Sequence, residues 1–257
     1  MNKIYKIYAL WVKDPGTPAA MGNQFLDTLD QLGPLGPIMK NWRLLDCVKR
    51  IGVPIAKVRP RITKFVEKNV SRDEDGAPDP IDGYYLLARG AEIDSEYGDS
   101  RSVTFNINVG STWYNEAGFE IGEPASLPDL DLVTYPIYAG ALKILVSNWA
   151  CPWAYAWGCL PEFPPLVEGG LTPKVQLPPF DNAWIAYLSA PLCIGLTPPT
   201  EILCEATPGG GMILSAVLER LDPGDPEHKR RSELLRKILV DRVGMGDDKH
   251  PARMGAY

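Results

Sequence analysis

Ala183-Trp-Ile-Ala-Tyr-Leu-Ser189 opens the part of the chain that decides the fold, and two further apolar runs follow it: Glu201-Ile-Leu-Cys-Glu-Ala-Thr207 and Met212-Ile-Leu-Ser-Ala-Val-Leu218. Each run has the length and the branched or aromatic content of a strand. Pro208-Gly-Gly-Gly211 separates the second run from the third. Because consecutive glycines adopt positive φ without steric penalty, the chain can reverse there, and the sequence predicts an antiparallel hairpin.

A charged amphipathic helix is predicted after this hairpin. Asp225 is suited to be its N-cap, Pro226 its first residue and Glu227 an acidic residue of its first turn. Apolar residues then recur at helical spacing, namely Leu234, Leu235, Ile238 and Leu239. Strand, hairpin and helix form a scaffold without evident chemistry.

Two more helices are predicted upstream. Thr17 caps the first, Pro18 occupies its first position and Gly33-Pro34 ends it. The second runs from about residue 132 to 149, before Cys151-Pro152. Strands are predicted at residues 3–12, 84–88, 102–109 and 153–158, and apolar and polar residues alternate in 102–109. The pattern indicates an α+β fold with mainly antiparallel sheet, flanked by about three principal helices.

The length of 257 residues and the 45% apolar content suit one large domain or two modest ones. We expect a single domain over residues 1–257, with possible closely packed lobes at 1–125 and 126–245 and a polar tail at 246–257. The five cysteines include no CxxC pair, which favours a reducing compartment. No signal peptide and no apolar run of about 20 residues is visible. We therefore expect a cytoplasmic protein.

Acidic residues concentrate in the middle of the chain. Residues 71–131 hold 3 Lys or Arg and 14 Asp or Glu, a balance of −11, against −6 for the whole chain. Such a segment is either a solvated polar surface or a site for a basic partner, and it disfavours direct nucleic-acid binding. The candidate partner-binding residues are Asp73, Glu74, Asp75, Asp79, Asp82, Asp94, Glu96 and Asp99.

Catalytic motifs are nearly absent from the sequence. It contains no P-loop, dinucleotide fingerprint, GxSxG or HExxH. The two histidines, His228 and His250, have no metal-ligand partner at suitable spacing, and His228 is expected on the surface of its helix. Asp129 and Asp131 form either a minimal metal pair or, as we favour, acids that complement the following helix dipole. We expect no cofactor, no metal and no enzymatic activity.

Several stretches resemble the immunity protein 52 family in order and spacing. They are Ile4-Tyr-Lys-Ile-Tyr-Ala-Leu-Trp11, Trp42, Asn148-Trp-Ala-Cys-Pro-Trp-Ala154, Ala183-Trp-Ile-Ala-Tyr-Leu188, Thr207-Pro-Gly-Gly-Gly-Met-Ile213 and Asp222-Pro-Gly-Asp-Pro-Glu-His228. The resemblance spans most of the chain, but residues 71–99 and 161–179 depart from the pattern. The matching motifs are structural, so they assign no contact residue.

The resemblance implies a non-enzymatic antitoxin. Members of the family are encoded beside polymorphic or type VI secretion toxins, and the implied partner is a metal-dependent nuclease with a restriction-endonuclease-like domain. No direct nucleic-acid or membrane partner is implied. Two other classes stay open, a carboxylate-based metal-dependent enzyme and a self-associating scaffold, and the sequence leaves the oligomeric state open.

Overall fold

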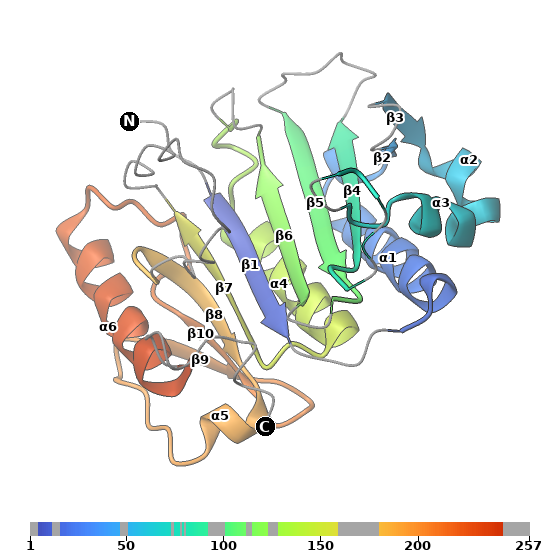
Figure 1. Cartoon of the computed structure of the whole chain (residues 1–257). Helices are drawn as coiled ribbons and strands as arrows, with labels where there is room; N and C mark the ends of the chain where they lie inside the picture. The colour runs from blue at the N-terminus through green and yellow to red at the C-terminus, as the bar shows by residue number, and fades with distance from the viewer. Residues whose placement is uncertain are drawn as a thin grey trace.

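The computed structural model describes residues 5–11, 16–46, 51–72, 75–77, 79, 81–91, 101–111, 115–122, 128–158 and 180–243 (Figure 1). The strands of these residues form one sheet in which every pair is antiparallel. Its order across the sheet is β3 (Ile51–Pro54), β2 (Trp42–Asp46), β4 (Tyr84–Ala91), β5 (Ser102–Val109), β6 (Asn115–Ile121), β1 (Tyr5–Trp11), β7 (Trp153–Gly158), β8 (Ala183–Leu188), β10 (Met212–Ser215) and β9 (Leu203–Ala206).

Strand β1 joins the two parts of the sheet. Its Leu10 lies opposite Glu116 of β6 on one side and Trp153 of β7 on the other. Six strands from residues 5–121 therefore continue directly into four strands from residues 153–215. The α+β class with antiparallel sheet is confirmed, whereas the domain boundaries stay a prediction.

Three long helices accompany the sheet, as the sequence predicts: α1 (Pro18–Leu32), α4 (Tyr135–Trp149) and α6 (Pro226–Val243). Shorter pieces are α2 (Ile55–Val58), α3 (Ile62–Lys68), α5 (Ala190–Cys193) and the 3-10 turns η1 (Gly33–Leu35), η2 (Pro37–Met39) and η3 (Arg59–Arg61). Thr17 Oγ1 accepts the Ala20 N–H at 3.2 Å, which confirms the cap of α1. Helix α4 begins at Tyr135, three residues later than expected, and Ala150 ends it with a φ of 46°.

The helices lie on opposite faces of the sheet. Tyr5, Ile7 and Ala9 of β1 belong to a core shared with α1 and α4, whereas Leu10 belongs to a second core shared with α6. This split follows from the two-residue period of a strand, which sends alternate side chains to opposite faces. Figure 1 shows α4 and α1 behind the sheet and α6 in front of its C-terminal strands.

Three strands were not predicted, namely β2, β3 and β6. Strand β6 carries the alternating pattern of a half-buried strand, with Glu116, Gly118 and Glu120 between Ala117, Phe119 and Ile121. Strands β2 and β3 have four or five residues each, and Gly52 and Pro54 weaken the local signal of β3.

Within the described ranges, no helix is both long and apolar enough to cross a bilayer.

Candidate functional site

Three of the eight acidic candidates lie in the described part of the chain. Asp75, Asp79 and Asp82 are in the loop between α3 and β4, whereas Asp73, Glu74, Asp94, Glu96 and Asp99 lie outside the described residues. Asp75 and Asp82 are exposed, and Asp79 is partly buried. The structure therefore places a small acidic group on this loop and leaves the other five residues as a prediction.

Backbone hydrogen bonds close this loop. Ser71 N–H donates to Gly83 O at 2.8 Å, and Asp79 N–H donates to Ser71 O at 2.7 Å. Asp79 Oδ1 accepts the Ile81 N–H at 2.9 Å, so one carboxylate of the group shapes the turn. The Asp75 and Asp82 carboxylates have no partner among the described residues, which leaves them available to a basic protein surface.

Polar side chains gather on the face of β1, β6 and β5 that points away from α1 and α4. The cross-strand register brings them together in rows. We call this surface the polar face and define it by Lys6, Tyr8, Thr104, Asn106, Asn108, Glu116 and Glu120, all of which are partly buried. The sequence pattern did not predict this surface, because 115–121 was not expected to be a strand, although the alternation of apolar and polar residues there was the available signal.

Two carboxylates of the polar face have partners on β1. Tyr8 Oη donates to Glu116 Oε2 at 2.9 Å, and Lys6 Nζ lies 3.9 Å from Glu120 Oε2. Burial raises the pKa of Glu120, and Lys6 offsets part of that rise. The backbone positions of Glu116 and Glu120 are about 13 Å apart, because four residues of strand separate them. Each carboxylate of the polar face therefore has its own partner on β1.

The Asp129–Asp131 pair has a structural role that differs from the expected one. Because α4 begins at Tyr135, neither acid lies in its first turn. Asp129 Oδ1 accepts the Asp131 N–H at 3.0 Å, and Asp129 Oδ2 pairs with Arg101 at 2.8 Å. The prediction that these acids complement the helix dipole is wrong, because the pair forms its own turn before the helix.

Among the described residues, no group of three or more His, Cys, Asp or Glu could hold a metal ion.

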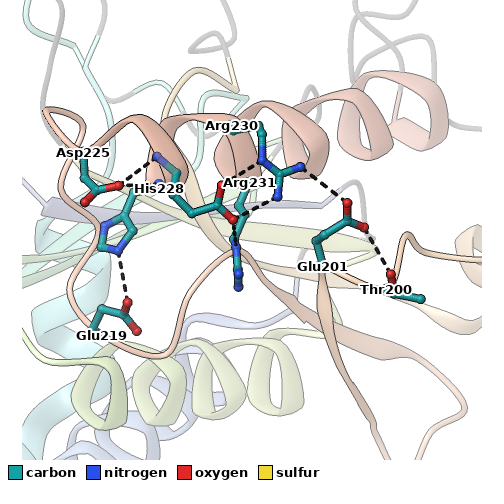
Figure 2. Close-up of polar contacts among 8 residues, drawn as sticks. Thr200, Glu201, Glu219, Asp225, His228, Arg230 and Arg231 are labelled. Atoms are coloured by element: carbon teal, nitrogen blue, oxygen red, sulfur yellow. Dashed lines mark hydrogen bonds and ion pairs between the residues drawn. The ribbon is translucent and has the colours of Figure 1, made fainter.

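Polar contacts at the start of α6 tie it to neighbouring loops (Figure 2). Asp225 Oδ1 accepts the N–H groups of Glu227 and His228 at 2.8 and 3.1 Å, as predicted for an N-cap. Glu227 accepts hydrogen bonds from Arg230 and Arg231, which lower its pKa to about 2. Arg230 also lies 3.4 Å from Glu201, so the ion pairs at the start of α6 extend to the segment before β9.

His228 is not the free surface residue that was expected. Its side chain is only 15% exposed, and Nδ1 accepts the Asp222 N–H at 3.0 Å. Since Nδ1 is the acceptor, Nε2 carries the hydrogen and donates to Glu219 Oε1 at 3.0 Å. The physical reason is that residues 219–222 fold back onto the first turn of α6, a contact that the helical pattern alone does not reveal (Figure 2).

The hairpin at the end of the sheet is the second surface of interest. Gly210 has a φ of 77°, and Thr207 N–H donates to Gly211 O at 2.9 Å, which confirms the predicted turn. Among the described strands, β9 pairs only with β10 and forms one edge of the sheet. All four of its residues are exposed, and Lys143 of α4 reaches Glu205 at 2.7 Å.

Comparison with known proteins adds one likeness in fold. No protein-family model and no curated protein matches the chain. Among solved structures, the chain is similar to the "Pseudomonas aeruginosa T6SS protein PA0821", with a TM-score of 0.55 and 12% sequence identity. The match covers 93% of this chain and 76% of that one, so it includes both parts of the sheet. At this identity the likeness shows a shared fold.

Proposed function

We propose that this protein is an immunity protein of a type VI secretion or polymorphic toxin system. It binds a cognate secreted toxin in the cytoplasm and neutralises it without catalysing a reaction. The toxin is a nuclease with a restriction-endonuclease-like domain. The observation that carries the proposal is the fold shared, over 93% of this chain, with a Pseudomonas aeruginosa type VI secretion protein.

The resemblance of the sequence to the immunity protein 52 family, which no family model reproduces, implies the same role. Its motifs coincide with structural elements of the fold: the opening motif is β1, the glycine motif is the β9–β10 turn, and Asp222–His228 is the folded-back start of α6. These are positions where the chain pairs, turns or is capped. Shared residues at such positions would preserve the scaffold of a family, while the residues that contact each member's partner vary.

The charge distribution suits a nuclease partner. A nuclease presents a positive surface to phosphate, and residues 71–131 of this chain have a formal balance of −11. A field of this kind accelerates encounter without requiring that every carboxylate touch the toxin. We assign the eight acidic candidates, including exposed Asp75 and Asp82, to this steering role.

Co-expression with the product of the neighbouring reading frame tests the proposal. We expect that product to be toxic alone, to be harmless beside this protein, and to form a complex with a Kd of about nanomolar or below, which is roughly −12 kcal/mol. A neighbouring product that is harmless alone, or that stays toxic in the presence of this protein, would contradict an immunity role.

The two alternative classes predict different results with the purified protein. A carboxylate-based enzyme would bind Mg²⁺, Mn²⁺, Zn²⁺ or Ca²⁺ with sub-micromolar affinity in calorimetry, and it would turn over a substrate. A scaffold would form a stable homo-oligomer in the absence of any toxin. The engagement of Asp129 by Arg101 and by a backbone amide favours the non-enzymatic proposal.

A further inference from the structure

Strand β9 offers an unpaired backbone edge whose polarity can be assigned residue by residue. Thr207 N–H bonds to Gly211 O on the β10 side, and hydrogen-bonded pairs alternate along an antiparallel ladder. Glu205 and Leu203 therefore direct their backbone groups toward β10, whereas Cys204 and Ala206 direct theirs away from the sheet. On the other side of β10, Ala216 N–H bonds to Trp184 O at 2.9 Å, as the same alternation requires.

The outward N–H and C=O groups of Cys204 and Ala206 have no partner in the described part of the chain. Both residues are exposed, and so is Leu203, at 40% of its surface. An exposed edge of this kind is a template for pairing with another strand, and proteins blunt such edges with prolines, bulges, covering elements, charged side chains or short strands. Strand β9 has four residues, of which only Glu205 is charged. Strand β9 has neither a proline nor an irregular register with β10.

Pairing of β9 with a second copy of itself is disfavoured by charge. Ile202 N–H is already donated to Pro199 O at 3.0 Å, and Pro208 has no N–H, so only Cys204 and Ala206 can donate. A two-fold pairing that uses both residues places Glu205 directly opposite Glu205 of the other copy. Like charges in that position are destabilising. Lys143 of α4 lies 2.7 Å from Glu205 and offsets part of this repulsion. A foreign strand with a basic residue opposite Glu205 avoids the repulsion altogether and shares the carboxylate with Lys143.

From this geometry we infer that an extended segment of the toxin adds to β9 as an eleventh strand, antiparallel like every pair in the sheet. The inference rests on the proposed function and names its contact. The outward groups of Cys204 and Ala206 bond to the backbone of the segment, and Glu205 faces a lysine or arginine. An apolar side chain of the segment packs against Leu203. Backbone pairing supplies affinity, and the side chains supply specificity.

Proline substitution tests the backbone part of the inference. Ala206→Pro removes an outward N–H and leaves the bonds to β10 intact, so the fold should persist while affinity for the neighbouring reading frame's product falls at least about tenfold. Cys204→Pro tests the other outward position. In the unsubstituted complex, hydrogen exchange at the Cys204 and Ala206 amides should slow, which gives a readout that no substitution can disturb.

Charge reversal tests the side-chain part. Glu205→Lys and Asp82→Lys change the net charge equally, but only Glu205 faces the inferred strand. Because Glu205→Lys also breaks the ion pair with Lys143, the two variants are compared in a Lys143→Met background. We expect Glu205→Lys to accelerate dissociation, whereas Asp82→Lys slows association alone. Equal kinetic effects of the two variants would show that Glu205 acts only through long-range electrostatics. That result would overturn the inferred contact between Glu205 and the added strand.

The outcomes separate this inference from the proposed function. If the neighbouring product neither binds nor is neutralised, the immunity role fails. If it binds and is neutralised while both amides exchange at the free rate and Ala206→Pro binds with unchanged affinity, the immunity role stands and the strand-addition inference is overturned.

Discussion

The hydroxyl of Tyr138 donates to the backbone oxygen of Tyr5 at 2.6 Å, which joins α4 to the strand at the centre of the sheet. The two rings meet edge to face with centroids 6.4 Å apart, and Trp184 of β8 lies 5.2 Å from the Tyr138 ring. Tyr138 is fully buried, and burial raises the pKa of its hydroxyl well above the ordinary value. One side chain thus connects residues from both parts of the sheet.

Tyr138→Phe should lower the free energy of unfolding by about 1 kcal/mol, because removal of the hydroxyl leaves the buried backbone oxygen of Tyr5 with one hydrogen bond fewer. Denaturant unfolding measures the change. Tyr135→Phe is the matched variant, since Tyr135 bonds Ser215 at 2.9 Å in a partly buried setting and should cost less. Equal stability of Tyr138→Phe and the unsubstituted protein would contradict the role of this bond.

Leu142→Ala should cost about 2 to 5 kcal/mol of stability, because Leu142 is fully buried under the sheet and its truncation leaves a cavity. Protection against the toxin should then fail through loss of the folded protein. Ser147→Ala, on the exposed side of the same helix, should change stability by no more than about 0.5 kcal/mol. Thermal unfolding of the two variants tests whether burial is what distinguishes the positions.

The pH dependence of stability should report on Glu120. Its pKa in the folded protein is raised above 4.5, so the folded state holds a proton that the unfolded state has lost, and stability falls as pH rises through the interval above 4.5. The Glu120→Gln variant should lack that decline, so its stability relative to the unsubstituted protein should rise with pH over the same interval. Urea unfolding across this interval measures it.

Lys6 supplies the control for this prediction. Because Lys6 opposes the rise in the pKa of Glu120, Lys6→Met should widen the interval in which stability falls. In a Glu120→Gln background the same substitution should leave the pH profile unchanged. A profile that shifts equally in both backgrounds would assign the effect to another group.

Two loop glycines with the same φ of 79° should respond differently to alanine. At Gly76 an added Cβ meets nothing within 4 Å, so the cost is the backbone strain of about 1 to 2 kcal/mol. At Gly83 it would overlap Val109 O and approach Ser111 N at 2.6 Å, both fixed backbone atoms. Gly83→Ala should therefore be the more destabilising by at least about 1 kcal/mol, measured by thermal unfolding.

Replacing Asp75 and Asp82 with lysine should slow association with the toxin and weaken its salt dependence, with little change in melting temperature. Both carboxylates are exposed and lack a partner in the described residues, so the fold does not depend on them. Stopped-flow rates at low and high salt provide the measurement. The same test applies to Asp94, Glu96 and Asp99. An association rate that is independent of salt would remove steering from the mechanism.

Local signals in the sequence were sufficient to predict an element where the residues of one short segment determine its conformation. Thr17 and Pro18 start α1, Asp225 and Pro226 start α6, and the glycines after Pro208 turn the hairpin. Alternation identified 102–109 as a half-buried strand. Caps, turns and periodicity act within a few residues, so one sequence suffices to recognise them.

The tertiary structure alone decided which segments meet. Leu10 lies between Glu116 and Trp153, neighbours more than a hundred residues away along the chain, and no local preference selects them. That pairing assembles the polar face, leaves β9 at an edge and sets which of its backbone groups point outward. The fold-back that covers His228 is likewise a contact between elements. The sequence by itself determined the caps, the hairpin turn and the strongly periodic segments. The packing of distant segments determined the surfaces, because burial and strand register are properties of the assembled sheet.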